Sequence, residues 1–240
     1  MSPVLEVVDL SKRFGAVTVV DDLGFTLDDG EALGVVGPNG AGKTTVLNLI
    51  AGDLRPTAGQ VRFRDEDVTR QPAHTRCRLG IGRTSQVPRP FEGLTVFENV
   101  LVGATFGTSM HRRNRAEACI AALDQAGLVD KANVRASTLT LLDRKRLELA
   151  RALATEPRVL LLDEIAGGLT EAEVLELVDT IKEIHASGRA IIWIEHIVHA
   201  LLRVVDRILA MSYGRKLIDG DPHEVMGSAE VRTIYLGAEG

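Results

Sequence analysis

An eight-residue stretch at positions 37–44, Gly-Pro-Asn-Gly-Ala-Gly-Lys-Thr, matches the phosphate-binding pattern G-x-x-x-x-G-K-[ST]. Its glycines let the backbone approach a phosphate without a Cβ clash, and the exposed amides of such a loop point toward an anion. Lys43 would reach the β and γ phosphates, and Thr44 would offer its hydroxyl to Mg²⁺. Because glycine makes up only about 7% of ordinary chains, a chance match is rare, and the sequence predicts nucleotide binding. The residues expected to line the phosphate site are Gly37, Pro38, Asn39, Gly40, Ala41, Gly42, Lys43, Thr44 and Thr45.

Two acids follow a second apolar run, Val-Leu-Leu-Leu-Asp-Glu at positions 159–164. A buried strand that ends there would deliver Asp163 to the metal at the carboxyl edge of a sheet. Glu164 would then orient and deprotonate a water molecule in line with the γ-phosphate. Such a run taken alone is more often a strand that ends in solvated acids. The phosphate loop upstream favours the catalytic interpretation.

Three further residues indicate little by themselves. His196 follows the apolar stretch Ala-Ile-Ile-Trp-Ile-Glu, and Gln86 follows a strand-like stretch. A single histidine after a strand is most often an ordinary surface or core residue, and Gln86 is equally uninformative alone. Phe14 is, by residue type, more often a core residue than a platform for a base.

The hydrophobic pattern predicts the elements that must position these residues. Strands are expected at 4–10, 17–27, 31–37, 60–64, 159–164, 190–195 and, as a hairpin, over 206–222. Helices are expected after the phosphate loop, from Thr95 to Ala104, at 112–127, from about 139, at 170–188 and in the C-terminal tail. Strands that alternate with helices indicate the α/β class, with a helical insert at residues 87–150 between two core segments, 1–86 and 151–240.

The composition restricts the kind of partner. The net charge of −5 over 240 residues argues against nucleic-acid binding, which depends on phosphate neutralisation by Lys and Arg. Cys77 and Cys119 match no metal-site spacing, which favours a reduced, cytosolic protein. The first residues carry Glu6 and Asp9 instead of a signal-peptide pattern, and no run approaches the roughly 18 apolar residues of a membrane span. Any role at a membrane is therefore expected at its cytoplasmic face, through a partner.

The order of these features resembles the ATPase domain of ATP-binding-cassette (ABC) proteins. The features follow one another as in that family. In chain order they are an aromatic residue, the phosphate loop, Gln86, a helical insert, the stretch Leu-Thr-Leu-Leu-Asp at 139–143, the strand with two acids and the strand before His196. The resemblance extends over essentially the whole chain. It implies one ABC ATPase domain, residues 1–240, with a mixed central sheet, an N-terminal antiparallel β part and an inserted helical subdomain.

The resemblance also implies roles by position. Phe14 would stack on adenine, and Gln86 would contact the metal and the attacking water and sense a membrane partner. His196 would hold the γ-phosphate of ATP, beside Glu164 as the catalytic base. Thr140 would bind the γ-phosphate held by a second ATPase subunit. The metal ligands implied for Mg²⁺ are Thr44, Gln86 and Asp163.

A narrower resemblance concerns the transported solute. Three stretches look like the LivG-type ATP-binding subunits of branched-chain amino-acid importers: RTSQ with RPFEGLTVFENVLVGA, then DRKRLELARAL, then the end DGDPHEVMGSAEVRTIYLG. This implies transmembrane permease subunits, a second ATPase and, indirectly, a solute-binding protein as partners. Related systems carry urea, short amides or other acids. The sequence also leaves open an ABC ATPase without a transport role, such as a repair or translation factor, and a small-molecule kinase.

The chain departs from the family at the signature motif, usually Leu-Ser-x-Gly-Gln, which aligns with residues 139–143. Leu142 replaces the glycine at a place where backbone must approach a phosphate closely, and Asp143 adds a negative charge, although it would also be a good helix N-cap. Ile165 replaces a proline, and Thr170 stands where the D-loop (166–170) usually has an acid or amide. The sequence therefore predicts a defective signature, and an asymmetric heterodimer in preference to a homodimer.

Overall fold

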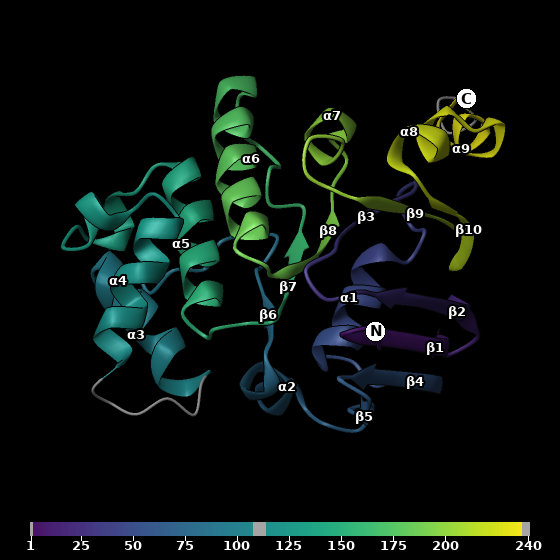
Figure 1. Cartoon of the computed structure of the whole chain (residues 1–240), viewed down its shortest axis with the longest axis horizontal. Helices are drawn as coiled ribbons and strands as arrows, with labels where there is room; N and C mark the ends of the chain where they lie inside the picture. Colours follow the sequence, from purple (N-terminus) through teal and green to yellow (C-terminus); the bar gives the residue numbers. More distant parts are fainter. Residues whose placement is uncertain (1, 108–113, 237–240) are drawn as a thin grey trace.

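The computed structural model describes residues 2–107 and 114–236, which fold around two β-sheets (Figure 1). The smaller sheet has the strand order β2-β1-β4-β5, and every neighbouring pair in it is antiparallel. Its strands are β1 (Leu5–Phe14), β2 (Val17–Leu27), β4 (Ala58–Phe63) and β5 (Glu66–Asp67). This is the N-terminal antiparallel part that the family resemblance implies.

The larger sheet has the order β10-β9-β3-β8-β7-β6 and is mixed. Its pairs from β9 to β6 are parallel, and only β9 and β10 form an antiparallel hairpin. Its strands are β3 (Ala32–Val36), β6 (Ile81–Arg83), β7 (Val159–Asp163), β8 (Ala190–Ile194), β9 (Arg207–Ser212) and β10 (Arg215–Gly220). Because parallel strands end at one edge of a sheet, the segments after β3, β6, β7 and β8 meet there.

Helices surround this sheet (Figure 1). Those outside the insert are α1 (Lys43–Ala51), α2 (Ala73–Leu79), α6 (Glu171–Ala186), α7 (Val198–Leu201), α8 (Pro222–Gly227) and α9 (Ala229–Leu236). Those between β6 and β7 are α3 (Val96–Phe106), α4 (Arg115–Gln125), the short turns η1 (Val129–Lys131) and η2 (Ala136–Thr138), and α5 (Leu141–Leu153). The division into a core and a helical subdomain at residues 87–150 stays a prediction.

Capping residues set two of the helix starts as the sequence predicts. Thr95 accepts a hydrogen bond from the amide of Glu98 at 3.2 Å, and the Glu98 carboxylate accepts from the amide of Thr95 at 2.7 Å. Thr170 and Glu173 form the same reciprocal pair at the start of α6. Each pair satisfies amides that the first helical turn leaves without partners.

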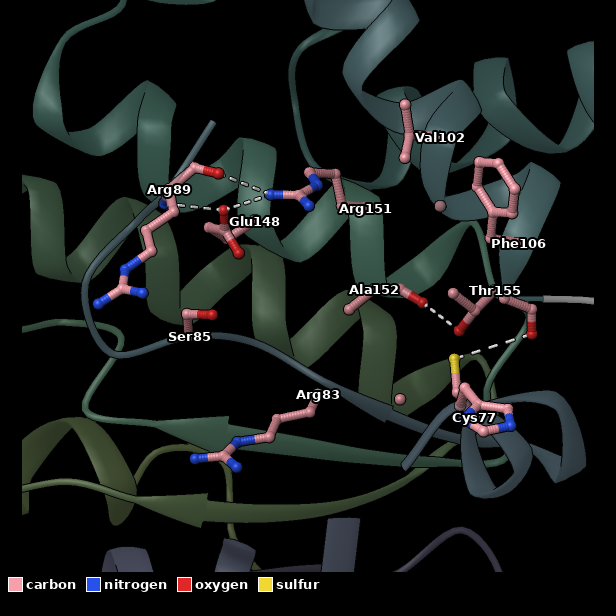
Figure 2. A pocket seen from close by; sticks show the side chains of 14 residues that line it. Cys77, Arg83, Ser85, Arg89, Val102, Phe106, Glu148, Arg151, Ala152 and Thr155 are labelled. Atoms are coloured by element: carbon pink, nitrogen blue, oxygen red, sulfur yellow. Dashed lines mark hydrogen bonds and ion pairs between the residues drawn. The ribbon is translucent and has the colours of Figure 1, made fainter. Parts of the chain in front are cut away.

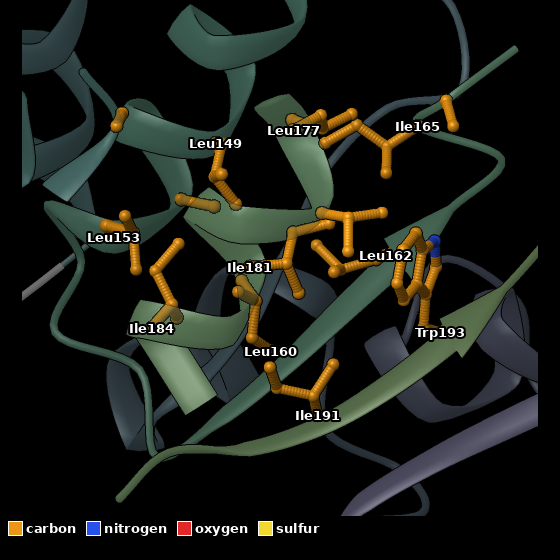
Figure 3. Packing of buried hydrophobic residues seen from close by; sticks show 14 of the residues in the cluster. Leu149, Leu153, Leu160, Leu162, Ile165, Leu177, Ile181, Ile184, Ile191 and Trp193 are labelled. Carbon is orange, nitrogen blue, oxygen red and sulfur yellow. The ribbon is translucent and has the colours of Figure 1, made fainter. Parts of the chain in front are cut away.

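The helices α5 and α6 pack against β7 and β8 through one apolar cluster (Figure 3). Leu149 and Ile181 come from the two helices, and Leu162 and Trp193 come from the strands. Ile165, which replaces the expected proline, is fully buried in the same cluster. Burying such a side chain contributes about 1.5–3 kcal/mol. This packing fixes the end of β7, where the two acids stand.

The structure differs from the sequence expectations at several places, of which three concern the longer elements. The helix α2 has no counterpart among the predicted elements, because its residues, AHTRCRL, include few apolar ones to form a stripe. The helix expected from residue 112 begins at Arg115, and residues 112 and 113 lie outside the described part. The strand β1 continues to Phe14, four residues beyond its predicted end.

Candidate functional site

The phosphate loop lies between β3 and α1, where the sequence motif requires it. Two of its glycines have backbone conformations that exclude side chains. A Cβ on Gly37 (φ +150°) would lie 2.3 Å from the carbonyl oxygen of Met211, and one on Gly42 (φ +95°) would lie 2.6 Å from that of Val19. The loop therefore fits closely against its neighbours. A hollow of about 210 Å³ lies between residues 39–45 and the Glu164 side chain.

Lys43 points back into the loop. Its Nζ donates to the carbonyl of Gly37 at 2.6 Å and to that of Pro38 at 3.1 Å, and its side chain is buried. Burial lowers the pKa of Lys43, and the nearby carboxylates of Glu164 and Asp163 oppose this shift. These two acids favour the charged form that neutralises phosphate.

Asp163 lies beside Thr44 at the end of β7. The Thr44 hydroxyl is 3.3 Å from Asp163 Oδ1, and Arg83 donates to Oδ2 at 3.1 Å. Burial raises the pKa of Asp163, and Arg83 opposes that shift. Arg83 also pairs with Asp53 at 2.6 Å and contacts Asn48. No motif in the sequence distinguishes Arg83, because its partners are remote along the chain.

The three residues expected to be catalytic are in direct contact. Gln86 donates from Nε2 to Glu164 Oε2 at 2.5 Å, and His196 Nε2 lies 2.6 Å from Glu164 Oε1. They come from the segments after β6, β7 and β8, which meet at one sheet edge. Glu164 has a left-handed backbone (φ +47°), an uncommon conformation for a residue with a side chain. The structure thus holds this carboxylate by both oxygens, at the wall of the phosphate hollow.

Glu195 is a functional candidate that sequence reasoning missed. Its buried carboxylate accepts from the amide of Ala166 at 2.7 Å and from that of His196 at 3.0 Å. Burial raises the pKa of Glu195, while these backbone donors favour its charged form. The residue joins the D-loop to the segment with His196. An acid at the end of a strand gives no sequence signal for such a role.

Phe14 and Thr140 lie outside this cluster. Phe14 ends β1 with an exposed ring, 5.0 Å from Lys12 Nζ, and its stacking on adenine stays a prediction. Thr140 caps α5, where its hydroxyl accepts from the amide of Asp143 at 3.2 Å. It is not among the residues that line the phosphate hollow, and its role toward a second subunit stays a prediction.

The structure corrects the prediction for the signature segment, residues 139–143. Thr140, and not Asp143, is the N-cap of α5. The sequence predicts that the Leu142 side chain obstructs the close approach of backbone to a partner's phosphate, but this side chain is buried in the apolar cluster of its own chain. Asp143 is also buried, and Lys131 pairs with it at 2.5 Å, so its charge is neutralised inside the chain. Both expected obstacles thus point inward, because the first turn of α5 rotates them onto the core.

Comparison with known proteins decides the family. The ABC transporter family model matches residues 20–167, more than half of the chain. The chain belongs to the ABC transporter ATPase family. It therefore binds nucleotide and hydrolyses ATP, and such ATPase subunits work with membrane permease components. Among the residues that the structure describes, no helix is both long and apolar enough to cross a bilayer.

Curated relatives of this ABC ATPase cover nearly its full length. The high-affinity branched-chain amino acid transport ATP-binding protein LivG of Escherichia coli (strain K12) is 36% identical, with 98% of each chain covered. BraF of Pseudomonas aeruginosa, named for the same transport, is 34% identical over 98% of each chain. The lipopolysaccharide export protein LptB of Acidithiobacillus ferridurans is 35% identical over 99% of this chain and 98% of its own.

Solved structures agree with this family. The ADP conformation of an ATP-binding cassette from an ABC transporter superposes with a TM-score of 0.90 at 26% identity, covering 99% of this chain and 100% of that one. A nucleotide-free ATP-binding cassette gives 0.89 at 26% identity, covering 98% and 99%. The two-sheet architecture is therefore that of an ABC ATPase, as the sequence predicts.

Proposed function

We propose that this chain is the ATP-hydrolysing subunit of an importer, which couples hydrolysis to the uptake of a small polar solute, namely a branched-chain or related amino acid. The relatives named for branched-chain amino-acid transport, similar over their full length, support this solute class. The catalytic part of this proposal rests on one observation, the contact of Glu164 with both Gln86 and His196 beside the phosphate hollow.

The proposed chemistry follows from this arrangement. Lys43 and the loop amides hold the phosphates, with the amides aimed at the anion. Glu164 accepts a proton from the attacking water, because its carboxylate lies at the wall of the hollow. His196 and Gln86 orient that carboxylate through its two oxygens. Phe14 is proposed to stack on the adenine.

We propose that Thr44, Asp163 and Gln86 would hold Mg²⁺. Hydroxyl, carboxylate and amide oxygens suit this hard cation, which binds through one or two carboxylates together with substrate phosphates. The fit has support in the buried Asp163, because a nearby cation would offset the burial that raises its pKa. When bound, the ion neutralises charge on the phosphates.

The permease is proposed to dock beside segment 86–94, at the cytoplasmic face of the membrane. A hollow of about 520 Å³ opens there between α2, α3 and α5, with Val102 and Phe106 in its lining (Figure 2). Arg151 also lines it, and its guanidinium lies 5.1 Å from the ring of Phe91, a residue that is 46% exposed. An exposed aromatic beside Arg is typical of an interface anchor. A cytoplasmic helix of the permease fits this surface.

The chain is further proposed to work as a dimer with a second ATPase subunit, so that Thr140 of one faces the phosphate site of the other. The sequence favours a heterodimer because of Leu142 and Asp143. Since both side chains are buried in their own chain, a homodimer is compatible with the structure as well.

The test is isolation of the full chain with its permease from native membranes. We expect co-purification with membrane permease subunits and ATPase activity that rises when an amino-acid-loaded binding protein is added. The relative named for lipopolysaccharide export points to lipid export as the competing function. A complex that responds to a lipid and not to amino acids would contradict the proposed solute class.

A further inference from the structure

Three charged side chains on α5 form hydrogen bonds with the backbone of the segment from Gln86 to Arg89. Lys145 donates from Nζ to the carbonyl of Gln86 at 2.8 Å. Glu148 accepts from the amide of Arg89 at 3.1 Å, and Arg151 donates to the carbonyl of Arg89 at 3.1 Å (Figure 2). Because the three are spaced three residues apart, they share one side of the helix. We call them the α5 grip.

Two residues of the α5 grip, Lys145 and Glu148, are unusually buried for charged side chains. Lys145 is 4% exposed and Glu148 is 6% exposed, although such residues are almost never fully buried unless they are paired. Glu148 is paired with Arg151 at 2.7 Å. Burial lowers the pKa of Lys145, and the carboxylates of Glu195, Glu164 and Glu148 oppose the shift. Apolar side chains would often give equal or greater stability at such a place, so stability alone does not account for the cluster.

Gln86 connects the α5 grip to the reacting carboxylate. Its carbonyl accepts from Lys145, while its side chain donates to Glu164 at 2.5 Å. One residue is therefore held from both sides. Lys145 lies in the N-terminal half of α5, and the N-cap of this helix is Thr140, whose role is proposed toward the second subunit.

We infer that Lys145 is a positioning residue of the ATPase site, which acts through Gln86. With Glu148 and Arg151 it fixes the backbone of residues 86–89 to α5, so that the Gln86 side chain stays within reach of Glu164. The helix and this segment then move as one body. A shift of α5 is transmitted directly to the catalytic carboxylate. The inference depends on the ATPase activity of the family and not on the proposed solute.

The first test compares Lys145→Met with Lys145→Arg in the full chain assembled with its permease. Methionine keeps an unbranched apolar side chain but removes the donor, whereas arginine restores it. We expect Lys145→Met to lower kcat by about tenfold or more, because small misplacements near reacting groups are costly, with KM for ATP changed less than threefold. Lys145→Arg should recover most of the loss. Lys182→Met, on the exposed side of α6, is the matched control and should equal the parent.

The second test asks whether Lys145 acts through Gln86. In a Gln86→Ala background, Lys145→Met should cause little further loss of kcat, because residues that act as one unit are not additive. Arg151→Met should also lower kcat and should be non-additive with Lys145→Met, and it carries the test if Lys145→Met does not fold. Multiplicative losses, or an unchanged kcat per nucleotide-binding site with only a lower Tm, would overturn the inference.

Discussion

His196 Nε2 lies 2.6 Å from Oε1 of Glu164, on the side of the carboxylate opposite to Gln86. The carboxylate is thus held in one orientation by residues from two different segments. A catalytic base must be held in a suitable position toward the proton that it removes, and these two contacts fix the orientation of the carboxylate. The contact links the segments after β7 and β8 at the wall of the phosphate hollow.

Glu164→Gln should leave ATP binding intact while turnover falls by about 10²-fold or more, because the amide keeps the shape but is not a base. ATP that is bound and not hydrolysed should also lengthen the lifetime of the dimer in which two ATPase subunits close on the nucleotide. Fluorescent-nucleotide titration and phosphate release measure the two effects. Glu171→Gln, at the exposed start of α6, is the control and should behave as the parent. Unchanged turnover in Glu164→Gln would assign the base elsewhere.

Lys43→Ala should abolish measurable ATP affinity. The Nζ of Lys43 lies inside the loop, on the carbonyls of Gly37 and Pro38, where it would neutralise the β and γ phosphates. Equilibrium binding of radiolabelled ATP to the full chain gives the result, with Lys182→Ala as the exposed control. Circular dichroism shows that the variant is folded. Parent-like affinity would contradict the phosphate-loop interpretation.

The sequence predicts the reacting groups better than the groups that hold them. The phosphate loop and the capping boxes are local, so spacing along the chain is enough to recognise them. Lys145 and Gln86 are separated by 59 positions, and Arg83 and Asp163 by 80. Arg83 and Asp163 meet because the sheet brings their strands together, and Lys145 meets Gln86 because α5 packs beside the segment after β6, and no local pattern encodes either contact.

Side-chain direction is the second limit on sequence prediction. Leu142 and Asp143 lie in the signature stretch, and alignment alone suggests that they face a partner. The cap at Thr140 fixes the phase of α5 and turns both side chains inward. The Asp143 carboxylate then forms an ion pair with Lys131, which lies in a turn that the hydrophobic periodicity does not predict.

Phe91→Ala should uncouple ATPase activity from transport while ATP affinity stays unchanged. The Asn99 side chain accepts a hydrogen bond from the backbone amide of Phe91 at 2.7 Å and donates one to the backbone carbonyl of Phe91 at 3.1 Å. Truncation of Phe91 therefore removes the ring without releasing the segment. An anchor of this kind is worth about 2 kcal/mol or more at an interface. Uptake into vesicles and ATPase activity are measured on the same preparation.

Ile120→Ala on α4 is the matched control for Phe91→Ala. Ile120 is 45% exposed, against 46% for Phe91, and it lies on α4, which contributes no residue to the lining of the hollow beside segment 86–94. We expect it to leave coupling intact. If Phe91→Ala lost ATP binding in proportion to transport, Phe91 would be a structural residue instead of a docking residue.

Thr140→Ala tests whether the divergent signature works. The Thr140 hydroxyl accepts from the amide of Asp143, and its own hydrogen is available for a phosphate oxygen of the second subunit. We expect kcat of the assembled transporter to fall about tenfold or more, as when one donor to a developing charge is lost. Thr95→Ala is the matched control, because its hydroxyl accepts from the N3 amide of α3 at the same 3.2 Å. Both variants should lose about 1 kcal/mol of stability, but only Thr140→Ala should lose turnover.

The same geometry predicts how the two ATP sites of a dimer compare. The sequence alone predicts unequal sites, because Leu142 and Asp143 would obstruct and repel the partner's γ-phosphate. With Leu142 in the core and Asp143 paired to Lys131, we expect Glu164→Gln in this chain and the matching change in the second subunit to reduce turnover similarly. Each change is assayed in an assembly that pairs one variant subunit with one parent subunit. If Glu164→Gln in this chain nearly stops turnover and the matching change in the second subunit leaves turnover almost unchanged, the signature is defective and the asymmetric heterodimer is correct.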